Sequence, residues 1–229
     1  AGALTCVINT ATVSGITADT NAIYSWTGPN SFSSSMASFT TGVEGAYSLV
    51  VTDPDNGCTS AATANVVSNT APPAASAVAS GNLNCNTSDI QLNGTGSAQG
   101  SNITYAWTTI DGHIVSGENT QTPLVDAQGV YTLHVSNSDN GCTSSASATV
   151  NQSAAVTASL IDQSNVSCFG AANGAATAAG LGGNGIYSYA WNNGANTAAV
   201  SNLTAGVYAV VVTHGESCSA SAAVTLAHG

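Results

Sequence analysis

The sequence predicts an all-β chain made of three tandem copies of one unit. Three observations lead to this prediction. The same landmarks recur in the same order: an early cysteine, Tyr-x-Trp, Gly-x-Tyr and a late cysteine. Apolar residues alternate with polar ones, which is the period of a half-buried strand. Turn-forming glycine and asparagine separate these alternating segments, and no segment shows a helical period.

The spacing of the landmarks sets the boundaries of the units. The tryptophans and the early cysteines both recur at a nearly constant interval, which is roughly 80 residues. We therefore expect domains at 1–71, 72–154 and 155–229, called here the first, second and third copy. Segments 69–76 and 151–156 join them, and the Pro72-Pro73 pair favours an extended, semi-rigid joint.

Each copy contains two strands marked by aromatic residues. In segment 46–52, Tyr47, Leu49 and Val51 fall on one face of the strand, and the equivalent segments of the other copies repeat the pattern. A tryptophan at one fixed position flanked by tyrosine is typical of core packing. The aromatic residues expected in the core are Trp26, Tyr47, Trp107, Tyr131, Trp191 and Tyr208.

A hairpin is expected to end each copy. Segments 53–57 and 138–141 contain Asp-Asn-Gly, whose residues tolerate positive φ and bond to their own backbone. The late cysteine follows the turn in phase with small apolar residues, as Cys58 does with Ala64 and Val66. We therefore expect the late cysteine on the buried face of the last strand.

The six cysteines allow 15 pairings, and the repeat favours the one that closes each copy on itself. The expected bridges are Cys6–Cys58, Cys85–Cys142 and Cys168–Cys218, around loops of about 50 residues, each stabilising its copy by about 4 kcal/mol. Free buried thiols are an alternative, and metal ligation is disfavoured because no Cys-x-x-Cys or paired-histidine spacing occurs. Such bridges predict an oxidising compartment.

Several short strands in each copy, with a tryptophan in the middle strand between two cysteines, predict a two-sheet Greek-key sandwich similar to an immunoglobulin domain. One feature differs from antibody domains. The late cysteine lies ten or eleven residues beyond the Gly-x-Tyr tyrosine, past the next turn. The bridge is therefore expected to tie the first strands of a sandwich to its last strand.

Composition limits the partners. The 229 residues include no lysine or arginine and 11 acidic residues, giving a formal charge of -11. Nucleic acid and anionic membranes are therefore unlikely partners, since binding either relies on cationic side chains. No run reaches the 18 or so apolar residues of a spanning helix, so no membrane insertion is expected. The first residue is alanine, which favours a processed chain or an excerpt of a longer one.

Residues 167–226 of the third copy contain, in order, Cys-Phe-Gly, Asn-Gly, Gly-Gly, Tyr-x-Tyr-x-Trp and Gly-x-Tyr-x-Val. With these landmarks the third copy resembles the SprB-type repeat of bacterial gliding-motility surface adhesins. The first two copies, with "YSWTGPNSFSSS" and "YAWTTIDGHIVSG", resemble the Ig-like and PKD-like modules that accompany such repeats. The resemblance implies an extracellular or cell-surface protein, although family members usually carry some lysine and arginine.

No catalytic constellation is expected. The stretch "GLGGNG" at 180–185 satisfies Gly-x-Gly-x-x-Gly, but the alternating strand "IYSYAW" follows it where a nucleotide site needs a helix. The histidines His113, His134, His214 and His228 are scattered, and no lysine or Gly-x-Ser-x-Gly elbow is present. We expect no enzyme and no cofactor.

Calcium is the one metal with candidate ligands. Asp53 and Asp55 lie on a tight turn that is similar to the first half of a calcium loop, but no bidentate glutamate follows. Ordinary turn chemistry also explains these carboxylates. Glycans are a second candidate modification, because Asn-x-Ser/Thr sequons begin at Asn86, Asn93, Asn102, Asn151, Asn165 and Asn202.

The function that these observations favour is a non-catalytic structural or adhesive array. Strand edges without lysine are either covered by glycans or meant to pair, which favours a fibre or homopolymer. Partners would be neighbouring copies, other cell-surface proteins or polysaccharides. The alternatives are carbohydrate-binding modules, which need exposed aromatic residues, and spacer modules of a secreted hydrolase.

Overall fold

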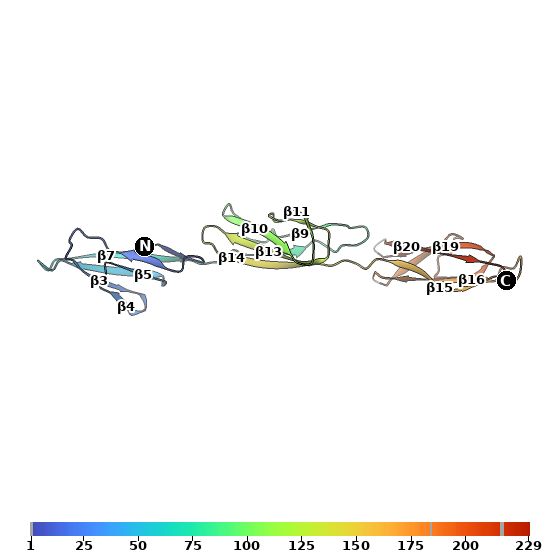
Figure 1. Cartoon of the computed structure of the whole chain (residues 1–229), viewed down its shortest axis with the longest axis horizontal. Coiled ribbons are helices and arrows are strands. Elements are labelled where there is room, and N and C mark those ends of the chain that lie inside the picture. Colours follow the sequence, from blue (N-terminus) through green and yellow to red (C-terminus); the bar gives the residue numbers. More distant parts are fainter. Residues whose placement is uncertain (1, 184, 216–217) are drawn as a thin grey trace. The chain divides into compact units, whose positions relative to one another are not determined.

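The computed structural model describes residues 2–183, 185–215 and 218–229. These residues form strands, turns and one short 3₁₀ helix, η1 (Pro29–Ser31), with no α-helix among them (Figure 1). The all-β prediction is confirmed. In the described part of the chain, no helix has the length and apolar character needed to cross a bilayer.

The chain divides into two compact units. Unit 1 comprises Ala1–Ser76, Gly94–Ala106 and Leu133–Ala146, and unit 2 comprises Ala77–Asn93, Trp107–Thr132 and Ser147–Gly229. The first copy lies in unit 1 and the third in unit 2, whereas the second copy contributes to both. The division into three separate domains stays a prediction.

Unit 1 contains a two-sheet sandwich built from the first copy. A five-stranded sheet has the order β1-β7-β6-β3-β4, and a second sheet pairs β2 with β5. The strands are β1 (Ala3–Thr5), β2 (Ala11–Ser14), β3 (Ile23–Gly28), β4 (Phe32–Ser34), β5 (Ser38–Thr41), β6 (Gly45–Thr52) and β7 (Thr59–Asn69).

The core of this sandwich lies between its two sheets. Ala11 and Val13 of β2 pack against the alternate inward residues of the larger sheet, among them Trp26, Tyr47 and Leu49. Phe32 and Phe39 stack beside them, with ring centroids 4.5 Å apart. The period-two pattern of the sequence therefore places its apolar face in the core, as a half-buried strand requires.

The second copy forms two further sheets. One is four-stranded with the order β11-β12-β9-β8, and the other is three-stranded with the order β10-β13-β14. The strands are β8 (Val78–Ala79), β9 (Ile90–Asn93), β10 (Ile103–Thr109), β11 (Ile114–Ser116), β12 (Leu124–Val125), β13 (Gly129–Asn137) and β14 (Thr143–Val150).

Unit 2 contains a sandwich built from the third copy. Its sheets have the orders β15-β16-β18 and β17-β19-β20. The inward residues include Ala176 and Ala178 from the first sheet and Trp191, Val210 and Val212 from the second. The strands are β15 (Thr157–Ser164), β16 (Gly174–Leu181), β17 (Tyr187–Trp191), β18 (Ala199–Leu203), β19 (Gly206–His214) and β20 (Ser219–Leu226).

Candidate functional site

The early cysteine lies at the same place in each copy. The residue two positions before it forms a parallel bridge with the end of that copy's last strand or the segment just after it: Leu4 with Ser68, Leu83 with Gln152 and Val166 with His228. Each partner lies ten residues after the late cysteine of the same copy. The early and late cysteines therefore lie at opposite ends of the last strand.

This geometry makes the predicted pairing inside each copy wrong. Ten residues of extended strand span about 33 Å, whereas the Cα atoms of a disulfide lie about 4.4–6.8 Å apart. A bridge between Cys6 and Cys58 would need the whole length of β7 to collapse. In the third copy, Cys168 and Cys218 are separated by the same number of strand residues.

The disulfides instead join successive copies. Cys6 bonds Cys142, with Cα atoms 5.0 Å apart, and Cys85 bonds Cys218, with Cα atoms 5.7 Å apart. The first bridge lies within unit 1 and the second within unit 2. In both, the early cysteine of one copy meets the late cysteine of the next. Cys58 and Cys168 are free and exposed.

The expectation that the late cysteine is buried depends on this bonding. Cys142 and Cys218, which are bonded, are 0% and 5% exposed. Cys58 is exposed, and so are the first residues of β7 that follow it. For Cys58 the predicted burial is therefore wrong, because no bonded early cysteine covers that end of the first copy.

Asn140 organises the junction around the Cys6–Cys142 bridge. Its side chain is 2% exposed, and its Nδ2 donates to Asn69 Oδ1 at 3.1 Å and to Ala71 O at 3.0 Å. Its backbone oxygen accepts from the Cys6 N–H at 3.1 Å. The joint at 69–76, expected to be a simple extended linker, is thus held by hydrogen bonds to the hairpin turn that precedes Cys142.

A second side chain holds the same joint. The Ser144 hydroxyl donates to Pro73 O at 2.5 Å. Sequence reasoning gave Asn140 and Ser144 no role beyond the turn and strand. The signal that could have identified Asn140 is the Asp-Asn-Gly-Cys sequence, which places an asparagine two residues before the late cysteine in both the first and the second copy.

The two candidate calcium ligands belong to a self-bonded turn. Asp53 Oδ1 accepts from the Asp55 N–H at 2.8 Å, and Asp53 Oδ2 accepts from Asn56 Nδ2 at 2.7 Å. The Gly57 N–H donates to Asp53 O at 2.8 Å, which closes the hairpin. Both carboxylate oxygens of Asp53 thus have partners inside the turn. Among the described residues no three His, Cys, Asp or Glu side chains gather closely enough to hold a metal ion.

The three tryptophans lie in the interior. Trp26, Trp107 and Trp191 are 2%, 3% and 4% exposed. Each indole N–H donates to a backbone carbonyl farther along the same copy: Met36 O, Thr120 O and Thr197 O, at 2.9–3.1 Å. Since the polar atom is satisfied and the ring is covered, these residues offer no exposed face for a ligand.

The Gly-x-Tyr tyrosines form the same local corner in every copy. Tyr47, Tyr131 and Tyr208 each donate a hydroxyl hydrogen bond to the backbone oxygen four residues earlier, at 2.6–3.0 Å. This tyrosine corner is a feature of immunoglobulin-like sandwiches. Tyr47 and Tyr131 are buried and Tyr208 is half-buried. Burial raises the pKa of Tyr131 above its usual value of 10.0.

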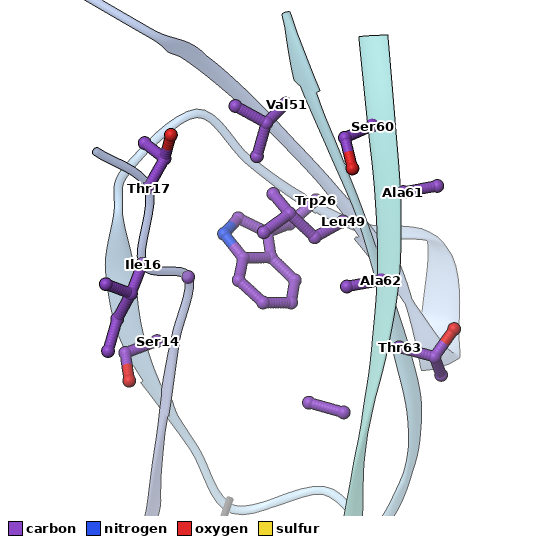
Figure 2. Close-up of a pocket in the computed structure, with 12 residues that line it drawn as sticks. Ser14, Ile16, Thr17, Trp26, Leu49, Val51, Ser60, Ala61, Ala62 and Thr63 are labelled. Atoms are coloured by element: carbon purple, nitrogen blue, oxygen red, sulfur yellow. The ribbon is translucent and has the colours of Figure 1, made fainter. Parts of the chain in front are cut away.

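A pocket beside β7 opens in unit 1, with a volume of about 290 Å³. Figure 2 shows Ser14, Ile16 and Thr17 on one side, Ser60–Thr63 of β7 on the other, and Trp26 and Leu49 between them. Gly15, Val51 and Ala64 complete the lining. The described lining contains small, hydroxyl and apolar side chains without a charged group, so it has no acid, base or nucleophile for catalysis beyond hydroxyl groups.

The pocket follows an open strand edge. β7 pairs with β6 from Thr59 to Val66 and with β1 only from Val67 to Asn69. In the described part of the chain, the outer edge of Thr59–Val66 therefore has no strand beside it. Neither lysine nor arginine protects this edge.

Five of the six sequon asparagines have exposed side chains and one does not. Asn102 is half-buried, and its Nδ2 donates to Asn137 Oδ1 at 3.0 Å and to Asp139 Oδ2 at 2.9 Å. Glycosylation replaces one hydrogen of this nitrogen, so a glycan at Asn102 would remove at least one of the two hydrogen bonds. The exposed asparagines are Asn86, Asn93, Asn151, Asn165 and Asn202.

The histidines lie in different settings. His113 Nδ1 and Asp126 Oδ1 are 2.6 Å apart on an exposed surface. His134 is exposed on β13, whereas His214 is 2% exposed at the end of β19. The structure brings none of these side chains to the pocket.

Comparisons with known proteins give one family match and several structural similarities. Residues 160–196 match the SprB repeat family. No curated protein matches the chain in sequence. Among solved structures, the titin I-band fragment I67-I69 aligns over 100% of this chain and 94% of its own, at 11% identity and a TM-score of 0.45.

Two further solved structures contain arrays of immunoglobulin domains. The N-terminal four Ig domains of Dscam1 isoform 6.44 align over 100% of this chain and 71% of their own, at 15% identity and a TM-score of 0.32. Immunoglobulin domains 1-5 of Sidekick-1 align over 99% of this chain and 57% of their own, at 12% identity and a TM-score of 0.36.

Proposed function

We propose that the chain is a non-catalytic, extracellular array of structural or adhesive modules from a bacterial cell-surface or secreted protein. The observation that carries this proposal is the pair of disulfides between successive copies. Each closes a loop of more than 130 residues, and by the chain-entropy estimate such a loop stabilises the folded chain by about 5 kcal/mol. Covalent ties between copies suit a protein that transmits force along its length.

The same bonds support an extracellular setting. Disulfides form and persist in oxidising compartments and are rare in the cytosol. The SprB repeat match at 160–196 supports the same setting. The partners that the surface favours are neighbouring copies, other surface proteins or polysaccharides, because a chain without lysine or arginine has no cations with which to bind nucleic acid.

Carbohydrate binding and a spacer role in a secreted hydrolase remain the alternatives, and carbohydrate binding has less support. Sugar rings stack on exposed aromatic faces, but Trp26, Trp107 and Trp191 are all buried. The pocket beside β7 exposes no aromatic platform, since its only aromatic residue is Trp26. A glycan array tests this alternative: saturable binding to a defined sugar would favour it.

The extracellular placement is tested on the cells that make the protein. An antibody raised against the chain should label intact cells or secreted material as strongly as it labels permeabilised cells. Labelling that requires permeabilisation would contradict the proposal.

The structural role is tested under flow. Cells carrying C6S/C58S/C142S/C168S lose the first bridge between copies, whereas cells carrying C58S/C168S keep both bridges and lack only the two exposed thiols. At equal surface amounts, the first variant should detach from a substrate at lower shear stress than the second. Equal detachment of the two strains would show that the first bridge does not transmit adhesive force.

A further inference from the structure

The two disulfides repeat one relation between copies. Cys6 and Cys142 are 136 residues apart, and Cys85 and Cys218 are 133 apart. Each joins the early cysteine of one copy to the late cysteine of the next. The relation leaves two cysteines over: Cys58, the late cysteine of the first copy, and Cys168, the early cysteine of the third. One is a late cysteine and the other an early one, which is the combination that each observed disulfide contains.

The free late cysteine Cys58 follows a turn of the same conformation as the turn before the bonded Cys142. The Cys58 N–H donates to Asn56 Oδ1 at 2.8 Å, and the Cys142 N–H donates to Asn140 Oδ1 at 2.9 Å. Gly57 and Gly141 have φ values of 75° and 67°. Cys58 is thus presented as Cys142 is, and what differs is the partner.

The surface around the free late cysteine Cys58 has no neighbouring segment of the described chain packed on it, whereas the equivalent surface beside Cys142 is covered by the segment that contains Cys6. At the bonded junction, a Cβ added to Gly141 would lie 2.8 Å from Val7, the residue that follows Cys6. At Gly57 such a Cβ would meet no atom within 4 Å. Asn140 is 2% exposed, whereas Asn56 is exposed. The first copy therefore presents an unfilled version of the junction face.

The free early cysteine carries the matching half. Val166 forms the parallel bridge two residues before Cys168, as Leu4 does before Cys6. The residue after Cys168 is Phe169, which is 89% exposed and occupies the position of Val7, itself 72% exposed at the bonded junction. Val7 lies against Gly141 there, and in the described part of the chain no such apolar side chain lies against the open face at Gly57.

We infer that Cys58 and Cys168 are the two cysteines left unused by this early-to-late pairing, and that each bonds the complementary cysteine of a further copy of the repeat. For the chain alone, the bond joins Cys168 of one molecule to Cys58 of a second. The inference rests on the proposed structural function and names its partner. Because the two joined surfaces differ, the contact is head-to-tail, which gives an open filament unless the rotation between successive molecules closes it into a ring.

The bond forms by thiol–disulfide exchange with a small disulfide such as oxidised glutathione. The Cys168 thiolate attacks one glutathione sulfur and expels a glutathione thiolate. The Cys58 thiolate of the second molecule then attacks the Cys168 sulfur of the mixed disulfide and expels the second glutathione thiolate. The two thiol protons and two electrons end on two molecules of reduced glutathione.

The test uses the whole chain and three variants in a glutathione buffer. The wild type should give a ladder of oligomers on a non-reducing gel that a reductant collapses to monomer, and C58S/C168S should stay monomeric. C58S alone and C168S alone lack one end and should stop at dimers. Both residues are exposed and free, so the folds of these variants should be intact.

The decisive measurement mixes equal amounts of C58S and C168S, one of them isotopically labelled. Random pairing gives homodimers and heterodimers in the ratio 1:2:1. Complementary ends should enrich the heterodimer about tenfold over this ratio, the factor that corresponds to about 1.4 kcal/mol of junction contacts. A statistical mixture, or an absence of dimers, would overturn the inference.

Peptide mapping of native, unreduced material identifies the source of the partner. A Cys168–Cys58 peptide identifies a second molecule of this chain, and a bridge from either cysteine to a late or early cysteine of another sequence identifies a further copy of the repeat. Free thiols at both positions would overturn the inference. The same map tests the proposed function separately: if Cys6–Cys142 and Cys85–Cys218 are present, that function survives even when the outer bonds are absent.

Discussion

The strongest prediction concerns how far the chain extends when it is pulled by its ends. In the variant C58S/C168S the two bridges between copies remain and no free thiol can exchange with them. The shortest covalent path runs from the N-terminus to Cys6, across to Cys142, back along the chain to Cys85, across to Cys218 and on to the C-terminus. This path contains about 73 residue steps, against about 228 in the chain without bridges.

At about 3.5 Å per residue, the bridged variant should extend to about 260 Å and the reduced one to about 800 Å. Single-molecule force spectroscopy should therefore record a gain of about 540 Å when a phosphine reductant is added to the stretched molecule. In a matched control, C6S/C58S/C142S/C168S, only Cys85–Cys218 remains. That control should extend to about 330 Å before reduction.

Bridges inside each copy would give a different length. In C58S/C168S they would leave only Cys85–Cys142, and the molecule would extend to about 600 Å before reduction. An oxidised length of about 600 Å would therefore refute the pairing between copies. An oxidised length of about 800 Å would show that neither bridge forms.

Three further predictions follow from the local contacts. Tyr131→Phe removes the buried hydroxyl that donates to Ala127 O, and should lower the free energy of unfolding by about 1–3 kcal/mol. Tyr208→Phe changes a half-buried ring and should lower it less. Denaturant titration of the unreduced protein compares the two variants. Burial raises the pKa of Tyr131, so its stabilising contribution is complete below pH 10 and is lost as the pH rises through the folded-state pKa. Between pH 9 and 11.5, the melting temperature of Tyr131→Phe should therefore fall less steeply with pH than that of the wild type. Equal slopes would contradict this. Asn140→Ala loses the hydrogen bonds to Asn69 and Ala71 as well as those of the turn, whereas the matched Asn56→Ala loses only those of the turn. Asn140→Ala should therefore lower the free energy of unfolding by about 1–2 kcal/mol more than Asn56→Ala. Equal decreases in the same titration would show that the junction contacts contribute nothing.

The features that the sequence predicted correctly are local. Alternation along segment 46–52 places Tyr47 and Leu49 in the core because neighbouring side chains of a strand point to opposite faces. The Asp-Asn-Gly segment forms the hairpin because those residues supply its positive φ and its side-chain hydrogen bonds. A few consecutive residues decide each of these features.

The cysteine pairing could not be predicted in this way because it depends on a contact distant in sequence. The short strand β1 pairs parallel with the far end of β7, so Cys6 lies about a strand's length from Cys58. Had β1 paired with the first residues of β7 instead, Cys6 would lie close to Cys58. The place on β7 at which this three-residue strand pairs therefore decides which copies are joined, and neither alternation nor spacing along the chain specifies that place.

The candidate site shows the same limit. Asn140 was predicted only as a turn residue, and its turn role is visible in the hydrogen bond to the Cys142 N–H. Its role at the junction comes from Asn69 and Ala71, far earlier in the chain. The sequence repeats this asparagine as Asn56, but only one of the two has a partner segment beside it.

The loops closed by the two bridges overlap, because Cys85 lies between Cys6 and Cys142. Any single break of the backbone between Cys6 and Cys218 therefore falls inside at least one closed loop, and the two fragments stay attached. Even two breaks, one before Cys85 and one after Cys142, leave all three pieces in one covalent molecule. A protein exposed to proteases outside the cell would thus survive nicks at its joints that would sever a chain bridged only within each copy.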